Sequence, residues 1–369
     1  MLYKYYNAIA ERGIELKNKV LSVIMAAAVG SGGFVLPQMP AAAETADVNV
    51  KLQPNVYSPF NETRFEGWGT ALCWWANRIG YSEKLTDDAA RLFYSEEGLS
   101  LDIGRYNIGG GDDPDHDHIT RSDSTVPGYW KDGTVNIVND GKDAEFEYDW
   151  TKDENQRNIA KKIQEYNSDV YFEGFSNSPP YFMTNSGCVG GGVDAADNLN
   201  PDMVDDFIDY IAEVTAHFKE DYGIEFKSYS PMNEPINGWA AYSDKQEGCN
   251  YNDFGLRNSV FTGLKERFLN YTNEDGEKIL ENVETAGMDE TNLNYSIWSY
   301  DKLSDEGRNA IDRIDTHTYG GNLRSELRDK CIAWDKDLWM SEVDVGGAKL
   351  VSGSGNMGAP NSSGAAHNT

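Results

Sequence analysis

This 369-residue sequence has few cysteines. It also lacks the common motifs of nucleotide-binding proteins, zinc proteins and serine hydrolases. It has 4 cysteines, and no two of them form a C-x-x-C pair that would bind zinc or perform thiol redox chemistry. It has no G-x-S-x-G elbow and no H-E-x-x-H pair. The glycine runs at 109–111 and 190–192 lack the Lys-Ser/Thr that follows a phosphate-binding loop. These absences argue against thiol redox enzymes, zinc enzymes with these motifs, serine hydrolases of the G-x-S-x-G type and proteins with a phosphate-binding loop.

Basic residues are the second shortage, with 32 Lys and Arg against 61 Asp and Glu and a net charge of −29. A sustained negative potential repels polyphosphate, so we expect no nucleic-acid partner. A neutral polysaccharide is indifferent to this charge. We therefore expect the partner to be a polysaccharide or oligosaccharide substrate.

Long apolar runs are also missing, apart from one near the start of the chain. Residues 1–43 read as a signal peptide, because two lysines precede the apolar run 20–29 and the small residues 41–43 offer an A-x-A cleavage site. A membrane anchor is the alternative, but glycines and Pro37 interrupt the run before the ~20 apolar residues of a span. We expect a secreted, extracellular protein without stable membrane insertion, in which 44–61 forms a linker or side-domain strand.

The rest of the chain alternates β-rich runs with helical stretches, which is typical of parallel strands joined by helical crossovers. The fold class that we predict is α/β, a (β/α)8 TIM barrel over residues 62–369. We see no eighth strand, so we expect the barrel to be C-terminally incomplete. A long irregular stretch at 109–150 would help to build the cleft. The expected strands are 65–69, 99–107, 170–175, 226–230, 282–286, 313–318 and 337–342, and the expected helices are 202–222, 254–269 and 323–333.

Two segments each place a glutamate at the end of an apolar, strand-like run. Glu234 lies in SPMNEP at 230–235, and Glu342 follows LWMS at 338–341. Glycosidic-bond cleavage needs two such carboxylates, since one gives a proton to the leaving oxygen while the other attacks or stabilises the anomeric carbon. We predict Glu234 as general acid/base and Glu342 as nucleophile. Two alternatives stay open: Glu234 caps a helix, or another acid such as Asp315 is the partner.

Polar residues near these glutamates are candidates for supporting roles. Asn233 can hydrogen-bond a sugar 2-hydroxyl. Arg105 is a lone cation at the end of a buried strand and needs a carboxylate partner, for which Glu342 and a purely structural ion pair are the two possibilities. His317 and Tyr319 share one face of a strand. Tyr319 either donates a hydrogen bond to Glu342 or is a core aromatic.

Aromatic residues are abundant, with 9 Trp and 21 Tyr. Sugars present flat C–H faces that stack on such rings, although most aromatic side chains in a chain of this kind lie in the core. The rings that we consider for the cleft are Trp68, Tyr129, Trp130, Tyr181, Trp239 and Trp298. From the whole set, the substrate-binding residues that we predict are Asn233, Arg105, Tyr319, Trp68, Tyr181, Trp298 and Asp112.

Histidine and aspartate cluster at 112–118, which raises a metal-binding hypothesis. A solvated acidic loop is the alternative, and a hydrolase with two glutamates needs no metal. We therefore expect no metal and no cofactor.

The four cysteines allow three pairings. Cys73 and Cys331 lie in apolar settings and are expected in the core as small hydrophobic residues. Cys188 and Cys249 lie in glycine-flanked loops. A loop-to-loop disulfide between them is the pairing that we predict for an exported protein.

Several segments carry a family resemblance that spans roughly residues 60 to 345. They are FEGWGTALCWWA at 65–76, RYNIGG at 105–110, SNSPPYFM at 176–183 and the two glutamate segments. Together they resemble glycoside hydrolase family 30, and within it the endo-β-1,6-galactanases, for which VPGYW at 126–130 is the main reason. Tyr181 stands where several relatives have Trp.

The resemblance implies a retaining mechanism with Glu234 as acid/base and Glu342 as nucleophile, on a (β/α)8 barrel normally fused to a small β-sandwich. It also implies sugar contacts from Asn233, Arg105 and Tyr319. The expected activity is cleavage of β-1,6-linked galactan in arabinogalactan side chains. Alternatives are a sibling specificity, namely β-1,6-glucanase, β-xylosidase or glucosylceramidase-like activity, and a non-catalytic carbohydrate-binding barrel.

Overall fold

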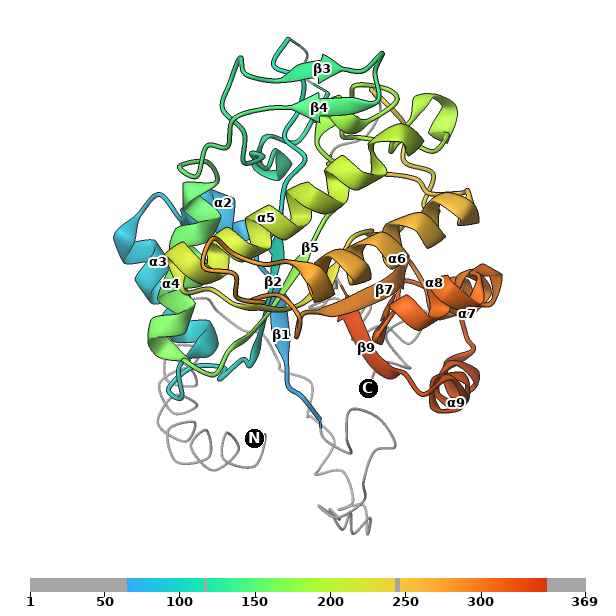
Figure 1. Cartoon of the computed structure of the whole chain (residues 1–369). Coiled ribbons are helices and arrows are strands. Elements are labelled where there is room, and N and C mark those ends of the chain that lie inside the picture. The colour runs from blue at the N-terminus through green and yellow to red at the C-terminus, as the bar shows by residue number, and fades with distance from the viewer. Residues whose placement is uncertain (1–64, 116–117, 243–245, 344–369) are drawn as a thin grey trace, which may run out of the picture. The chain divides into compact units, whose positions relative to one another are not determined.

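One parallel sheet lies at the centre of the part of the chain that the structure describes (Figure 1). The computed structural model describes residues 65–115, 118–242 and 246–343, so the predicted signal peptide and linker lie outside the described residues. Within these residues, seven strands pair in the order β1-β2-β5-β6-β7-β8-β9, and every pairing is parallel. Their bounds are β1 Gly69–Ala71, β2 Ile103–Asn107, β5 Tyr171–Phe175, β6 Phe226–Ser230, β7 Glu284–Glu290, β8 Arg313–His317 and β9 Asp337–Glu342.

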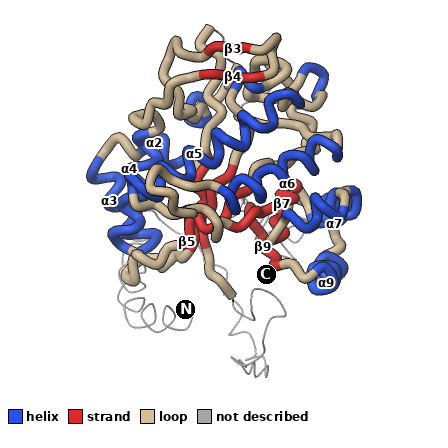
Figure 2. Tube along the Cα trace, viewed as in Figure 1, coloured by secondary structure: helices blue, strands red, loops and turns tan. Residues whose placement is uncertain are grey.

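Helices connect successive strands and lie outside the sheet (Figure 2). This is the arrangement expected for parallel strands, because each crossover must return the chain to the same edge of the sheet. The helices are α2 Trp75–Ile79, α3 Glu83–Tyr94, α4 Glu154–Tyr166, α5 Val204–Tyr222, α6 Phe254–Asn270, α7 Leu293–Lys302, α8 Asp305–Ala310 and α9 Arg324–Trp334. No helix among the described residues has both the length and the apolar character of a membrane span.

The longest helix, α5, shows how the sequence sets its ends. The Asn200 side chain caps a short 3₁₀ turn that begins at Pro201, and α5 follows directly. Gly223 ends the helix with φ 63°, a left-handed conformation that glycine adopts without steric cost. The fully buried Phe207 and Ile211 anchor the inner face of α5 to the core, where truncation of one such side chain costs about 2–5 kcal/mol. The predicted helix is therefore confirmed, as are the two predicted over 254–269 and 323–333.

Three predicted strands differ from the structure by more than one residue. The first begins at Gly69, not at 65, because Phe65 and Trp68 are exposed and do not enter the core. The second begins at Ile103, not at 99, and Leu99 is likewise exposed. β7 is longer than predicted and continues to Glu290, since Ala286 and Met288 remain buried beyond the expected end.

The sheet is curled, so that side chains from distant strands meet. Arg105 on β2 and Glu342 on β9 are five strands apart in the hydrogen-bonding order, yet Arg105 Nη1 lies 3.1 Å from Glu342 Oε2. Near the other end of the strands, the Trp339 indole donates a hydrogen bond to Glu66, which precedes β1. The predicted α/β class is confirmed as a curled, half-barrel parallel sheet. Neither an eighth strand of this sheet nor a β-sandwich occurs among the residues that the structure describes.

Irregularities in the strands occur next to the residues that form the site. The pairing register shifts between Phe172 and Glu173 on β5, between Met288 and Glu290 on β7, and after Thr316 on β8. The residue skipped on β7 is Asp289, which has φ 49°. Bulges of this kind re-aim a side chain relative to a regular strand.

The stretch 109–150, which was expected to be irregular, contains a two-stranded hairpin of β3 Asn136–Val138 and β4 Asp143–Glu145. The hairpin lies at the top of Figure 1. It belongs to the connection that follows the carboxyl end of β2, the end of a parallel barrel at which active sites form.

Candidate active site

The two predicted glutamates lie at the carboxyl ends of their strands and face each other. Glu234 follows β6, and Glu342 is the last residue of β9. Three atoms lie within 4.8 Å of one another: a carboxylate oxygen of Glu234, a carboxylate oxygen of Glu342 and a ring nitrogen of His317. Residues 108 positions apart in the sequence therefore share one small volume.

Two hydrogen bonds hold the carboxylate of Glu342. Tyr319 donates its hydroxyl to Oε1 at 2.8 Å, and Arg105 donates Nη1 to Oε2 at 3.1 Å. The side chain keeps 30% of its surface exposed, so a ligand can approach the oxygens. Arg105 places a positive charge against this carboxylate, and Tyr319 fixes its orientation. Tyr319 therefore has the contact with Glu342 that was one of its two possibilities, and Arg105 has both of its own, because it binds Glu342 and also buried structural carboxylates.

Glu234 is held more tightly and at a strained backbone position. Its φ is 48°, in the left-handed region that costs a non-glycine residue about 1–3 kcal/mol. Its amide donates to the Asp289 carbonyl at 2.8 Å, and its own carbonyl accepts from the Trp239 indole at 2.9 Å. Its side-chain oxygens contact His317 Nδ1 at 3.1 Å and accept from Asn237 Nδ2 at 2.8 Å. These contacts point the carboxylate into the site and do not form a helix cap.

His317 and Asp289 form a buried polar pair next to the two glutamates. His317 Nε2 lies 2.9 Å from Asp289 Oδ1 and 3.9 Å from Glu342 Oε2. Burial alone would lower the pKa of His317, but the carboxylates of Glu342 and Asp289 raise it well above its ordinary value. Burial would likewise raise the pKa of Asp289, whereas Arg105 and His317 hold it well below its usual range.

Arg105 connects four strands around this centre. Besides Glu342 it binds Glu173 on β5 at 3.1 Å, Asp289 on β7, and the Asn233 side-chain oxygen at 3.4 Å. Its guanidinium also lies over the Phe175 ring at 3.8 Å. Burial alone would lower the pKa of Arg105, and the surrounding carboxylates raise it, so the charge persists. The hydrogen bond from Arg105 to Asn233 Oδ1 orients the side-chain amide of Asn233.

Asp315, the alternative partner acid, is used elsewhere. It is fully buried and accepts two hydrogen bonds from Arg313, at 2.7 and 3.0 Å. Arg313 also binds Glu173. Asp315 therefore belongs to an ion-pair network in the interior, and the structure favours Glu342 as the partner of Glu234.

The remaining predicted substrate-binding residues divide into two groups. Asp112 and Tyr181 lie on loops after β2 and β5, at the end of the sheet that holds the glutamates, and the Tyr181 amide donates to the Gly110 carbonyl at 3.0 Å. Trp68 precedes β1 and its carbonyl accepts from the Asp102 amide, so it lies at the opposite, amino end. Trp298 lies on α7 and packs its ring on Phe254 of α6. The structure does not bring these two tryptophans to the glutamates, because the first strand starts four residues later than expected and Trp298 belongs to the helical layer.

The predicted disulfide between Cys188 and Cys249 is not formed, and both side chains are buried thiols. Their backbones run close together, since the Gly248 amide donates to the Val189 carbonyl at 2.8 Å. The sulfurs have different neighbours: Cys188 lies beside Asp112 and His118, and Cys249 contacts the Asn250 carbonyl. Burial raises the pKa of Cys249 to about 12.

Sequence reasoning missed Asp289 and Glu247. Asp289 was placed beyond the end of its strand, although the buried run from Ala286 to Met288 continues directly to it. Glu247 is fully buried, and its oxygens accept from Asn107 Nδ2 at 3.1 Å and the Gly110 amide at 3.0 Å. Burial raises its pKa well above the ordinary value. Nothing in its sequence context, a polar loop, pointed to this position.

Two groups of described side chains have metal-ligating atoms close together. One is Glu234, His317 and Glu342, in which both ring nitrogens of His317 contact carboxylates. The other is Asp112, His118 and Cys188, on loops after β2 and β5. The first group has the chemistry of an acid/base and nucleophile pair.

Two relatives with known names are similar to this chain in sequence. An endo-beta-1,6-galactanase from Hypocrea rufa is 27% identical over 332 residues, which cover 84% of this chain and 64% of that protein. An exo-beta-1,6-galactobiohydrolase from Bifidobacterium longum is 27% identical over 409 residues, which cover 89% of this chain and 26% of that protein. The chain thus spans less than two thirds of the length of these relatives.

Solved structures support the fold. A conserved exported protein from Bacteroides fragilis matches with a TM-score of 0.58 and 18% identity over 75% of this chain and 60% of that one. The endo-beta1,6-glucanase BT3312 matches with a TM-score of 0.56 and 19% identity over 80% of this chain and 60% of that one.

The family assignment comes from residues 60–262, which match the model of O-glycosyl hydrolase family 30. This segment is more than half of the chain and includes Arg105, Asn233 and Glu234. Glu342, which lies beyond it, is brought to Glu234 by the fold. The chain therefore belongs to O-glycosyl hydrolase family 30.

Proposed function

We propose that this glycosyl hydrolase cleaves β-1,6-linked galactan by a retaining, two-step mechanism, and that it acts outside the cell after removal of residues 1–43. The observation that carries the mechanism is the separation of the two carboxylates, whose oxygens come within 4.8 Å. Retaining glycosidases have carboxyl groups about 5 Å apart, whereas inverting enzymes need a wider gap to hold a water molecule.

Each carboxylate has a role that fits its surroundings. Glu342, with both oxygens fixed by Arg105 and Tyr319, would attack the anomeric carbon and form a covalent glycosyl-enzyme. Glu234 would protonate the leaving oxygen and then, as a base, activate the water that releases the sugar. Asn233, whose oxygen is oriented by Arg105, would hydrogen-bond the 2-hydroxyl of the bound sugar.

The substrate rests on the named relatives. Both the Hypocrea and the Bifidobacterium protein are named for β-1,6-linked galactose, which supports a β-1,6-linked galactan as the substrate. Arabinogalactan side chains are the source of this galactan that we propose. One name denotes endo action and the other exo action. Analysis of the reaction products is therefore needed to distinguish internal cleavage from the release of short ends.

Incubation with β-1,6-galactan, β-1,6-glucan and β-xylan tests the specificity. We expect galactan to be cleaved with the highest kcat/KM, and product chromatography separates a ladder of oligosaccharides from a single short product. An equal or higher kcat/KM on the glucan would reject the proposed galactan specificity and support β-1,6-glucanase activity. Proton NMR of the first-formed anomer tests the mechanism separately, because an α product from a β linkage would exclude retention on any substrate.

A further inference from the structure

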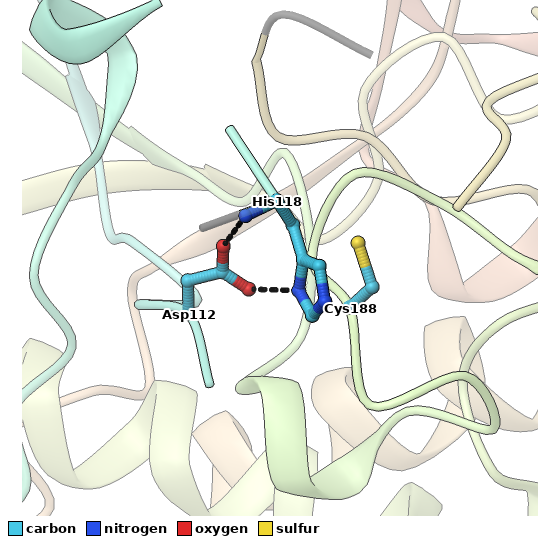
Figure 3. A group of neighbouring side chains, drawn as sticks. All are labelled: Asp112, His118 and Cys188. Atoms are coloured by element: carbon cyan, nitrogen blue, oxygen red, sulfur yellow. Dashed lines mark hydrogen bonds and ion pairs between the residues drawn. The ribbon is translucent and has the colours of Figure 1, made fainter. Parts of the chain in front are cut away.

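A second cluster of reactive side chains lies apart from the two glutamates. Asp112 and His118 follow β2, and Cys188 follows β5 (Figure 3). One ligand atom of each lies within 4.8 Å of the other two. His118 and Cys188 are buried, and Asp112 is nearly so, with 11% of its side chain exposed. The cluster shares no residue with the Glu234–His317–Glu342 group.

The donor set selects a class of ligand. A carboxylate, an imidazole and a thiol together suit Zn²⁺ and similar borderline-soft divalent cations, while Mg²⁺ and Ca²⁺ prefer oxygen ligands alone. Three protein donors leave a fourth position of a tetrahedral ion for water. The net charge of −29 also favours the approach of a cation over that of an anion.

Hydrogen bonds already orient the donors. Asp112 Oδ2 accepts from the His118 amide at 3.2 Å, and Oδ1 lies 2.9 Å from His118 Nδ1, as the dashed lines in Figure 3 show. The sulfur of Cys188 accepts from the Gly190 amide at 3.3 Å, a contact that would stabilise a thiolate. The Cys188 carbonyl accepts from Asn198 Nδ2 at 2.8 Å, which fixes the loop. Outer hydrogen bonds of this kind are what hold the ligands of metal sites in place.

We propose that Asp112, His118 and Cys188 form a binding site for one borderline-soft divalent cation such as Zn²⁺, which ties the loop after β2 to the loop after β5. Zinc binds oxygen and nitrogen at about 2.0–2.2 Å and sulfur at about 2.3 Å. Ligand atoms at most 4.8 Å apart need to move by less than the length of one covalent bond to reach such distances. The ion takes the place of the hydrogen bond between Asp112 and His118, and the neutral imidazole keeps its proton on the ring nitrogen that does not bind the ion. The Cys188 thiol releases its proton to the solvent and binds as the thiolate.

Metal binding to the chelator-treated 369-residue chain tests the site directly. Equilibrium dialysis should give one tightly bound Zn²⁺ per chain, and Cd²⁺ should produce the ultraviolet charge-transfer band of a cadmium thiolate. Cys188→Ser should abolish the band and, like His118→Gln, weaken Zn²⁺ binding by more than roughly 10-fold. Cys249→Ser and His217→Gln are matched controls, because each removes a thiol or imidazole outside the cluster, and both should bind as the parent chain does.

Two results would overturn the site. One is a parent chain that shows no cadmium–thiolate band, and the other is a band that survives Cys188→Ser. If the variants do not fold, as judged by circular dichroism, X-ray absorption at the zinc edge of the parent chain decides. One sulfur among nitrogen and oxygen neighbours supports the site, and a shell of nitrogen and oxygen alone rejects it.

Discussion

The imidazole of His317 contacts the carboxylate of Glu234, with Nδ1 3.1 Å from Oε1. The same ring reaches Asp289 at 2.9 Å through Nε2 and lies 3.9 Å from Glu342. Three carboxylates thus surround one fully buried histidine. A positive charge on this ring would stabilise the whole group, and its protonation is therefore the first property to measure.

His317 should be protonated at neutral pH. Its pKa is raised well above the ordinary value of about 6.5, since the surrounding carboxylates outweigh the opposing effect of burial. The stability that it contributes is fully present below pH about 6.5 and is lost only as the pH rises through the folded-state pKa. Nitrogen-15 NMR of labelled histidine should show both ring nitrogens protonated at pH about 7.

His217 provides an internal control in the same spectrum. It stacks on Trp150 at 3.8 Å, and burial lowers its pKa in spite of the nearby Asp221. It should be neutral at the pH at which His317 is charged. Assignment follows from His217→Gln and from His317→Gln, and a neutral His317 at pH about 7 would contradict the arrangement of charges described above.

Removal of the proposed nucleophile should stop turnover without preventing binding. Glu342→Gln keeps the shape of the side chain and loses the charge that faces Arg105. We expect kcat to fall by roughly 10⁴-fold or more, the scale seen when one member of a catalytic group is removed, while calorimetry still detects the oligosaccharide. Asp315→Asn, which alters the alternative acid, is the comparison variant and is measured on folded protein. An unchanged kcat for Glu342→Gln would exclude this residue.

The proposed acid can be recognised by its dependence on the leaving group. Glu234→Ala should lower turnover of natural galactan by roughly 10²–10⁴-fold, because the sugar leaving group needs a proton. Aryl galactosides with acidic phenols need little protonation and should lose much less. Parallel kcat/KM measurements on both substrates check this, and equal losses would mean that Glu234 is not the acid.

The sequence predicted the parts of the site that lie at or near the carboxyl ends of predicted strands. Glu234, Glu342 and Tyr319 could be placed because each ends or follows such a strand, and Arg105 because it is a lone cation within one. The carboxyl ends of parallel strands meet at one edge of the sheet. Their distances could not be predicted, because these depend on how strongly the sheet curls. That curl is set by packing between residues far apart in the sequence.

Local irregularities limited the rest. Asp289 projects into the site because it is the bulged residue of β7, and a bulge has no signature in a run of alternating residues. Trp68 was expected near the carboxyl end of the first strand. Because that strand begins four residues later than expected, Trp68 lies before its amino end instead. The pairing of Cys188 with Cys249 failed for a related reason: close backbones do not fix the direction of the sulfurs.

Asp289 should be a major source of stability, because it neutralises Arg105 and His317 in the interior. Asp289→Asn leaves these cations short of one carboxylate, and breaking a buried pair costs about 3–5 kcal/mol. Because its pKa is lowered, the contribution is present above the unfolded-state pKa of about 3.9 and is lost as the pH falls through the folded value. Urea unfolding at pH about 6 should show the full difference in the free energy of unfolding, and the difference should shrink only below pH about 4. Asp88→Asn, which removes an exposed pair with Lys84, is the matched control and should change stability far less. A comparable effect of both substitutions would show that the buried charges around His317 do not stabilise the fold.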